Sequence, residues 1–93
     1  MIKSFKNELT RAAFEGEALK GFPADLLKVT RRKLQYLDSA GALLDLLSPP
    51  GNRLEALSGD RKGQHSIRVN DQFRICFIWT EEGPRDVEFV DYH

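Results

Sequence analysis

The chain has 93 residues, 41% of them hydrophobic and 30% charged, which is typical of a globular protein and excludes a disordered one. Its 14 Lys and Arg residues balance 14 Asp and Glu residues, and this neutrality argues against a protein that holds nucleic acid by bulk electrostatic attraction. The single cysteine excludes an intramolecular disulfide framework and a CxxC zinc site.

We expect one domain over residues 1–93, located in the cytoplasm. The length fits a single small domain, and the sequence contains no linker that would divide two. No apolar run approaches the ~20 residues of a membrane span. The opening MIKSF also lacks the apolar core of a secretory signal, so no membrane partner is expected.

Helices are expected in the first half of the chain and strands in the second. Apolar residues recur at helical spacing up to Leu47, and the pattern changes to period two after Gly51. Residues 72–80 are apolar on both sides in their second half, which predicts a central strand. This order predicts an α+β fold in which N-terminal helices cover one face of an antiparallel sheet. The expected helices cover 7–15, 24–39 and 42–47, and the expected strands cover 2–5, 53–57, 64–69, 72–80 and 86–90.

Polar residues line one side of the longest expected helix. They recur at spacings of three, four and seven and comprise Lys28, Arg31, Arg32 and Gln35. A basic stripe of this kind is typical of the solvated face of an amphipathic helix, and we interpret it in that way.

One cysteine and two histidines are further candidates for chemistry. Cys76 lies in an apolar run, so packing explains it better than catalysis does. His65 is in phase with Ile67 and Val69 and is expected to pack in the same way. Neither His65 nor His93 has neighbours at metal-ligand spacing, so we expect no metal site and no cofactor.

Two arginines are predicted to share one face of the sheet. A three-residue turn over 70–72 pairs Ile67 with Ile75. The opposite face is then shared by Ser66, Arg68, Arg74 and Cys76, whereas a two-residue turn would move Arg74 to the apolar face at a cost. The pattern therefore favours the longer turn.

What compensates these two positive charges is open from the sequence. Two guanidinium groups on one face repel each other unless an anion lies between them, and phosphate fits because its oxygens match the guanidinium fork. The alternative is that each arginine pairs with a carboxylate of the acidic tail, since residues 80–93 carry five acidic groups and one basic group. That tail hides two mildly basic upstream segments, so overall neutrality does not exclude a local anion site.

The sequence ends in Asp91, Tyr92 and His93, directly after the last expected strand. C-termini are usually frayed. This one could bring a carboxylate, a phenol and an imidazole to a phosphate held by the arginines.

Residues 49–93 closely resemble the HigB-type toxins of bacterial toxin–antitoxin modules, also called the plasmid maintenance system killer family. The strand pair SIRVNDQFRICF and the terminal DYH carry this resemblance, and MIKSF and GFPADLLKVTRRKLQYLD extend it over essentially the whole chain. HigB-type toxins belong to the RelE superfamily. The resemblance therefore implies a RelE-like α+β fold with a small twisted sheet.

The resemblance also implies an activity and its partners. Family members are metal-independent endoribonucleases that cleave mRNA in the ribosomal A site and so inhibit translation and growth. HigA-like antitoxins with a helix-turn-helix domain neutralise them, and DNA is contacted only through that antitoxin. The residues carried over as catalytic are Arg68, Arg74, Asp91, Tyr92 and His93, and those assigned to substrate binding are Ser58, Arg61 and Lys62.

Two departures from the family pattern predict a milder toxin. Many members have lysine where this chain has Ser58, and some have histidine where it has Glu55. Losing a cation and gaining an anion beside the site should weaken phosphate binding.

Two other functions remain as alternatives. One is a non-catalytic toxin on the same scaffold, like the gyrase-directed ParE toxins, and the other is a plain protein- or RNA-binding module. ParE toxins lack the basic and aromatic site residues, so Arg68, Arg74 and Tyr92 favour the nuclease.

Overall fold

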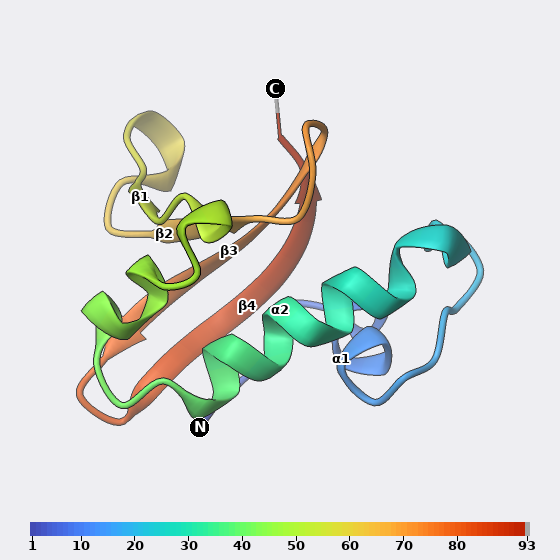
Figure 1. Cartoon of the computed structure of the whole chain (residues 1–93), viewed down its shortest axis with the longest axis horizontal. Coiled ribbons are helices and arrows are strands. Elements are labelled where there is room, and N and C mark those ends of the chain that lie inside the picture. Colours follow the sequence, from blue (N-terminus) through green and yellow to red (C-terminus); the bar gives the residue numbers. More distant parts are fainter. Residues whose placement is uncertain (93) are drawn as a thin grey trace.

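The structure is a computed structural model that describes residues 1–92. Two helices precede a four-stranded sheet (Figure 1). The helices are α1 (Glu8–Phe14) and α2 (Leu27–Ser39), and the strands are β1 (Glu55–Ala56), β2 (His65–Arg68), β3 (Phe73–Thr80) and β4 (Gly83–Asp91). Short 3₁₀ turns cover Ala24–Leu26, Leu43–Leu47, Pro50–Asn52 and Gly59–Arg61.

The sheet has the order β1-β2-β3-β4, and every neighbouring pair is antiparallel. Both helices pack against one face of it, as Figure 1 shows for α2. The core lies between these layers, where apolar side chains from helices and strands meet, among them Leu34, Leu37, Ile67, Ile75, Phe77, Val87 and Phe89. The predicted α+β fold is confirmed, and β3 is the central strand that its apolar second half predicted.

The predicted register between β2 and β3 is also confirmed. Ile67 pairs with Ile75, and Arg68 pairs with Arg74. The turn over 70–72 is held by Asn70, whose Oδ1 accepts hydrogen bonds from the backbone N–H groups of the two residues before Arg74. An asparagine that bonds to the backbone two or three residues ahead is a common way to fix such a turn.

Two predicted strands are mostly wrong. Residues 2–5 form a single parallel bridge, between Phe5 and Val87, rather than a strand. The segment 53–57 contributes only the two residues of β1, because Pro50–Asn52 is a 3₁₀ turn and Arg53 takes a left-handed conformation with φ 46°. A residue in that conformation cannot continue an extended strand.

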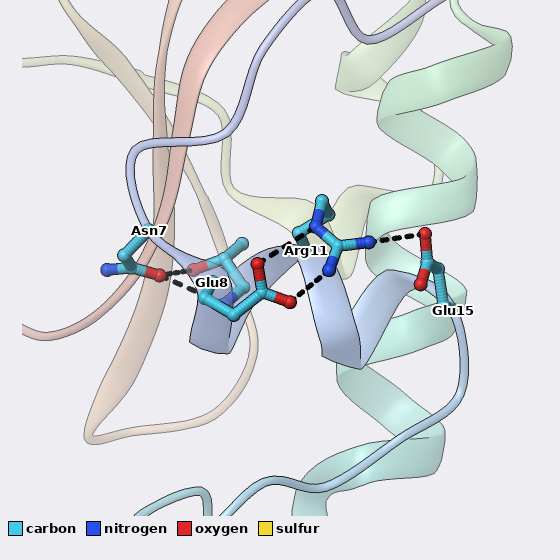
Figure 2. A network of polar contacts seen from close by, with 5 residues as sticks. Asn7, Glu8, Arg11 and Glu15 are labelled. Carbon is cyan, nitrogen blue, oxygen red and sulfur yellow. Dashed lines mark hydrogen bonds and ion pairs between the residues drawn. The ribbon is translucent and has the colours of Figure 1, made fainter.

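The outer edge of β4 is covered by the N-terminal segment and by α1. The Phe89 N–H donates to Thr10 Oγ1 at 3.0 Å, and the Thr10 hydroxyl donates to Asn7 Oδ1 at 2.7 Å. Figure 2 shows Asn7 at the start of α1, where it caps the helix, and Arg11 between Glu8 and Glu15. The bond from Phe89 satisfies a backbone N–H that an open sheet edge would leave free.

Candidate functional site

The predicted arginines lie on the sheet face that is turned away from the helices, which we call the distal face. Strand pairing places its residues in two rows across the sheet. One row contains Arg68, Arg74 and Val90, and the next contains Glu55, Ser66, Cys76 and Glu88. The sequence predicted that Ser66, Arg68, Arg74 and Cys76 share a face, and this is confirmed.

Arg74 is held firmly in the centre of the distal face. Its Nε donates to Ser66 Oγ at 2.7 Å, and its Nη2 donates to the backbone carbonyl of Arg53 at 2.7 Å. The side chain is only 13% exposed. Nη1 forms no hydrogen bond among residues 1–92, so this nitrogen still has N–H groups with which to bind an anion.

Carboxylates do compensate the arginines, but not those of the acidic tail. Arg68 forms an ion pair with Asp71 of the turn, and Arg74 lies 3.9 Å from Glu55 of β1. The tail residue Glu88 pairs instead with Arg61. The alternative that Arg68 and Arg74 pair with carboxylates of the acidic tail is therefore wrong. The antiparallel register puts Glu88 opposite Cys76 rather than opposite an arginine.

The C-terminal residues extend the distal face by one step. The Tyr92 N–H donates to the Gln72 carbonyl at 2.9 Å, which continues the β3–β4 ladder past Val90. Alternation along the strand places Tyr92 on the same face as Arg74, at a diagonal position within reach of an aromatic side chain.

Asp91 is not placed beside the arginines. Asp91 pairs with Phe73, so it belongs to the helix-side face, and its carboxylate accepts a hydrogen bond from the Gln72 amide at 3.1 Å. His93 lies outside the residues that the structure describes.

The three residues assigned to substrate binding lie around the 3₁₀ turn Gly59–Arg61. Ser58 and Lys62 flank this turn and are exposed. Arg61 reaches the distal face, where it contacts Glu88 at 3.2 Å and Gln64 at 3.1 Å. The positive charge of Arg61 is therefore partly neutralised by the Glu88 carboxylate, whereas Lys62 forms no ion pair among residues 1–92.

Cys76 is fully buried, as its apolar run predicted, although it belongs to the distal face. Burial raises the pKa of its thiol, Glu88 adds to the rise, and Arg61 and Arg74 oppose it. A raised pKa keeps the sulfur protonated and therefore poorly nucleophilic.

His65 packs near the Phe77 ring, with ring centroids 6.3 Å apart.

Within residues 1–92, no group of three or more histidine, cysteine, aspartate or glutamate side chains could hold a metal ion. No helix in the same part of the chain is long and apolar enough to cross a membrane.

A second polar feature lies along α2. The stripe Lys28, Arg31, Arg32 and Gln35 is exposed, as interpreted from the sequence, but it also lines a surface cavity of about 520 Å³. Arg31 is fixed there, because its Nε donates to the Phe14 carbonyl at 3.1 Å and its guanidinium lies over Gly16. None of the three cations forms an ion pair in the described residues.

Sequence reasoning missed a buried polar pair between α2 and the segment before β1. Lys33 is 6% exposed and Asn52 is fully buried, and Lys33 Nζ donates to Asn52 Oδ1 at 2.6 Å. The available signal was the position of Lys33, three residues after Thr30 and four before Leu37 on the apolar side of the helix. A charged residue at such a position is rarely buried without a specific partner.

An antiparallel sheet with helices on one face and a basic, aromatic-edged second face defines an α+β protein with the RelE-like fold. A solved structure with this architecture, described as the YoeB-YefM complex from Staphylococcus aureus, aligns over 100% of this chain and 98% of its own chain with a TM-score of 0.62. The sequence identity is 14%, so this likeness concerns the fold alone.

Sequence comparisons identify the family. Residues 3–93 match the model of the HigB-like toxins, described as RelE-like toxins of the type II toxin–antitoxin system HigB. Toxin HigB-1 of Vibrio cholerae serotype O1 is 40% identical over 82 residues, which cover 87% of this chain and 86% of the relative. Endoribonuclease HigB of Proteus vulgaris is 33% identical over 93 residues and 100% of both chains. The chain belongs to the HigB family of type II toxins.

Proposed function

We propose that this toxin is a metal-independent endoribonuclease that cleaves mRNA in the ribosomal A site and is neutralised by a HigA-like antitoxin. The observation that supports this most directly is the position of Arg74, whose Nε and Nη2 are fixed by Ser66 and Arg53 while Nη1 forms no hydrogen bond within residues 1–92. A relative that matches the whole chain is named an endoribonuclease, in agreement with this site.

The chemistry follows from the groups on the distal face. Cleavage uses the neighbouring 2′-hydroxyl of the RNA as nucleophile, breaks the bond to the 5′-oxygen and leaves a 2′,3′-cyclic phosphate. Arg68 and Arg74 stabilise the charge that develops on the phosphate oxygens. Tyr92 stacks on a base, which is worth ~1–3 kcal/mol, or takes part in proton transfer through its hydroxyl.

The ribosome has a physical role in this proposal. The arginines and Tyr92 supply charge and an aromatic surface but no free-standing general base, so the rate depends on in-line alignment of the RNA. Positioning of this kind contributes several kcal/mol to catalysis, and a ribosome holds the mRNA more firmly than a small neutral protein can.

The direct test combines the purified chain with programmed ribosomes and maps the 5′ ends of the mRNA fragments. We expect cuts in the A-site codon, 2′,3′-cyclic phosphate ends, no cleavage of the same mRNA without ribosomes, and loss of cleavage when a HigA-like antitoxin is added. Growth inhibition without mRNA cuts, together with blocked gyrase, would instead support the ParE-like alternative.

Ser58→Lys is expected to increase toxicity. The Ser58 side chain is exposed and caps no helix, so a lysine fits without disturbing the turn. A cation about 4–6 Å from a phosphate contributes about 1 kcal/mol in a wet site, or several-fold in rate. Ribosome-dependent cleavage at equal expression measures this, with Ser39→Lys at the end of α2 as the charge-matched control. Equal or slower cleavage by the Ser58 variant would refute the prediction.

Arg31→Ala should weaken ribosome docking only slightly and leave the cleavage step intact. Arg31 shares the α2 cavity with Lys28 and Arg32, and one phosphate contact among several contributes a modest, salt-dependent part of affinity. We expect a loss of a few-fold in ribosome affinity and an unchanged rate at saturating ribosomes. Arg85→Ala, which removes an exposed cation from β4, is the control. A large fall in the saturated rate of the Arg31 variant would contradict this assignment.

A further inference from the structure

The buried contact between Lys33 and Asn52 connects the helical layer to the arginine of the candidate site. Lys33 belongs to α2, and Asn52 ends the 3₁₀ turn Pro50–Asn52, which lies next to β2. In Figure 1 the segment between α2 and β1 runs back from the end of α2 to the strands. Arg53, which directly follows Asn52 in this segment, contacts Arg74 through its backbone carbonyl.

Asn52 is fixed by three hydrogen bonds. Its Nδ2 donates to the carbonyls of Leu46 at 3.2 Å and Ser48 at 3.3 Å, and its Oδ1 accepts from Lys33 Nζ. A lysine ammonium can only donate, and carbonyls can only accept, so this amide has one possible orientation. Both ends of the side chain are therefore engaged, and the backbone at residue 52 is held in place.

The adjacent backbone carries the contact to Arg74. Arg53 has a left-handed conformation, with φ 46° and ψ 56°, which is uncommon for a residue other than glycine and persists where neighbouring contacts hold it. In this conformation its carbonyl accepts the hydrogen bond from Arg74 Nη2 at 2.7 Å. Loss of the anchor at Asn52 would let this carbonyl move.

Burying the charged side chain of Lys33 costs free energy of folding. Within residues 1–92 it forms no ion pair, and its ammonium contacts the neutral Asn52 amide and the Tyr36 ring, whose centroid is 5.7 Å away. Burial lowers the pKa of Lys33, and the positive charges of Arg32 and Arg68 lower it further. An apolar side chain of similar length would fill the same space without this penalty.

We propose that Lys33 and Asn52 are positioning residues that hold the Arg53 carbonyl, and through it the Arg74 guanidinium, in the orientation needed to bind the reacting phosphate. The proposal rests on the endoribonuclease function proposed above. Neither residue touches the RNA. They act by keeping Arg74 in one orientation. This matters for the rate, because displacing an active-site group by about 1 Å can lower the rate ~100-fold.

Lys33→Met separates this role from simple support of the fold. Methionine has similar length and removes a buried charge, but it also leaves the buried Asn52 Oδ1 without its donor. These two effects on stability oppose each other, so we expect only a small change in the melting temperature. The rate at saturating ribosomes should nevertheless fall roughly tenfold, with little change in ribosome affinity. Lys20→Met makes the same chemical change at an exposed position and should change neither quantity.

Asn52→Ala should lower the same rate and also the melting temperature, since it leaves Lys33 without its acceptor. Thr10→Val is the matched control for lost stability. It removes a buried hydroxyl that supports the fold through Phe89, without a link to Arg74. We expect this variant to melt earlier and to cleave at the normal saturated rate.

A double-mutant cycle shows whether Lys33 acts through Arg74. In an Arg74→Lys background, which lacks the guanidinium that Arg53 holds, Lys33→Met should change the rate less than twofold. Solvent exchange of the Arg74 Nη2 protons, which are bonded to the Arg53 carbonyl, should be faster by NMR in the Lys33 variant than in the unchanged protein. This second measurement needs no ribosome and no cleavage.

The outcomes are distinct. If the unchanged chain cleaves, Arg74→Ala does not, and Lys33→Met matches the unchanged chain in rate and proton exchange, then the positioning proposal is wrong and the function stands. An equal loss of rate in both backgrounds would also overturn it, since Lys33 would then act independently of Arg74. Absence of cleavage by the unchanged chain would refute the proposed function itself, and normal proton exchange at Arg74 in the Lys33 variant would still refute the positioning.

Discussion

Replacing Arg74 with alanine is expected to reduce ribosome-dependent mRNA cleavage by at least ~100-fold while leaving the protein folded. The loss of one preorganised donor to a developing oxyanion costs about 3–4 kcal/mol of transition-state stabilisation. This free energy corresponds to a fall in rate of at least ~100-fold. Arg74 is the candidate for this donor because its guanidinium is fixed by Ser66 and Arg53, and its Nη1 forms no hydrogen bond in the described part of the chain.

The measurement is the single-turnover cleavage rate at saturating ribosomes, together with thermal melting. Lys20→Ala removes the same charge from an exposed position outside the sheet and should cleave normally. A folded Arg74→Ala protein that cleaves at the original rate would remove Arg74 from the site. Antitoxin binding by both variants checks that each remains correctly folded.

Deleting Tyr92 and His93 is expected to leave a folded protein that binds its antitoxin and no longer cleaves mRNA. Within residues 1–92, Tyr92 adds one backbone hydrogen bond to the sheet, to Gln72, and the loss of that bond should lower stability by about 1 kcal/mol. The deletion removes the aromatic group that alternation places beside Arg74, and the imidazole that the family resemblance assigns to catalysis.

Tyr92→Phe distinguishes between the two possible roles of the tyrosine side chain, stacking and a function of its hydroxyl. Retained cleavage would mean that the ring acts by stacking on a base, and lost cleavage would mean that the hydroxyl is needed for a hydrogen bond or a proton transfer. Cleavage, toxicity and melting are compared for the intact, shortened and phenylalanine chains. A shortened chain that melts normally and still cleaves would place the active site elsewhere.

The elements whose signals are local could be read from the sequence. Helical spacing identified α2, and the alternation of residues 72–80 identified the central strand β3. The register that places Arg68 opposite Arg74 was also predictable, because a one-residue slip would have put Arg74 among apolar side chains. Patterns of this kind record which face of an element meets water.

The N-terminal segment and β1 were harder to predict because their partners are distant in the chain. Ser4 contacts Asp86, 82 residues away, and such pairing leaves no periodic trace in five residues. The segment 53–57 has a strand-like composition, but Arg53 turns left-handed to present its carbonyl to Arg74, 21 residues away. Long-range hydrogen bonds therefore overrode the local pattern.

The sequence by itself determined that helices cover one sheet face and that two arginines share the other, because burial periodicity depends only on spacing along the chain. The tertiary structure alone decided what holds each arginine. Arg68 faces Asp71 of the turn, and Arg74 is held by Ser66 and by the Arg53 carbonyl. A hydrogen bond forms wherever the fold brings a donor within about 3 Å of an acceptor, and no spacing rule encodes that distance.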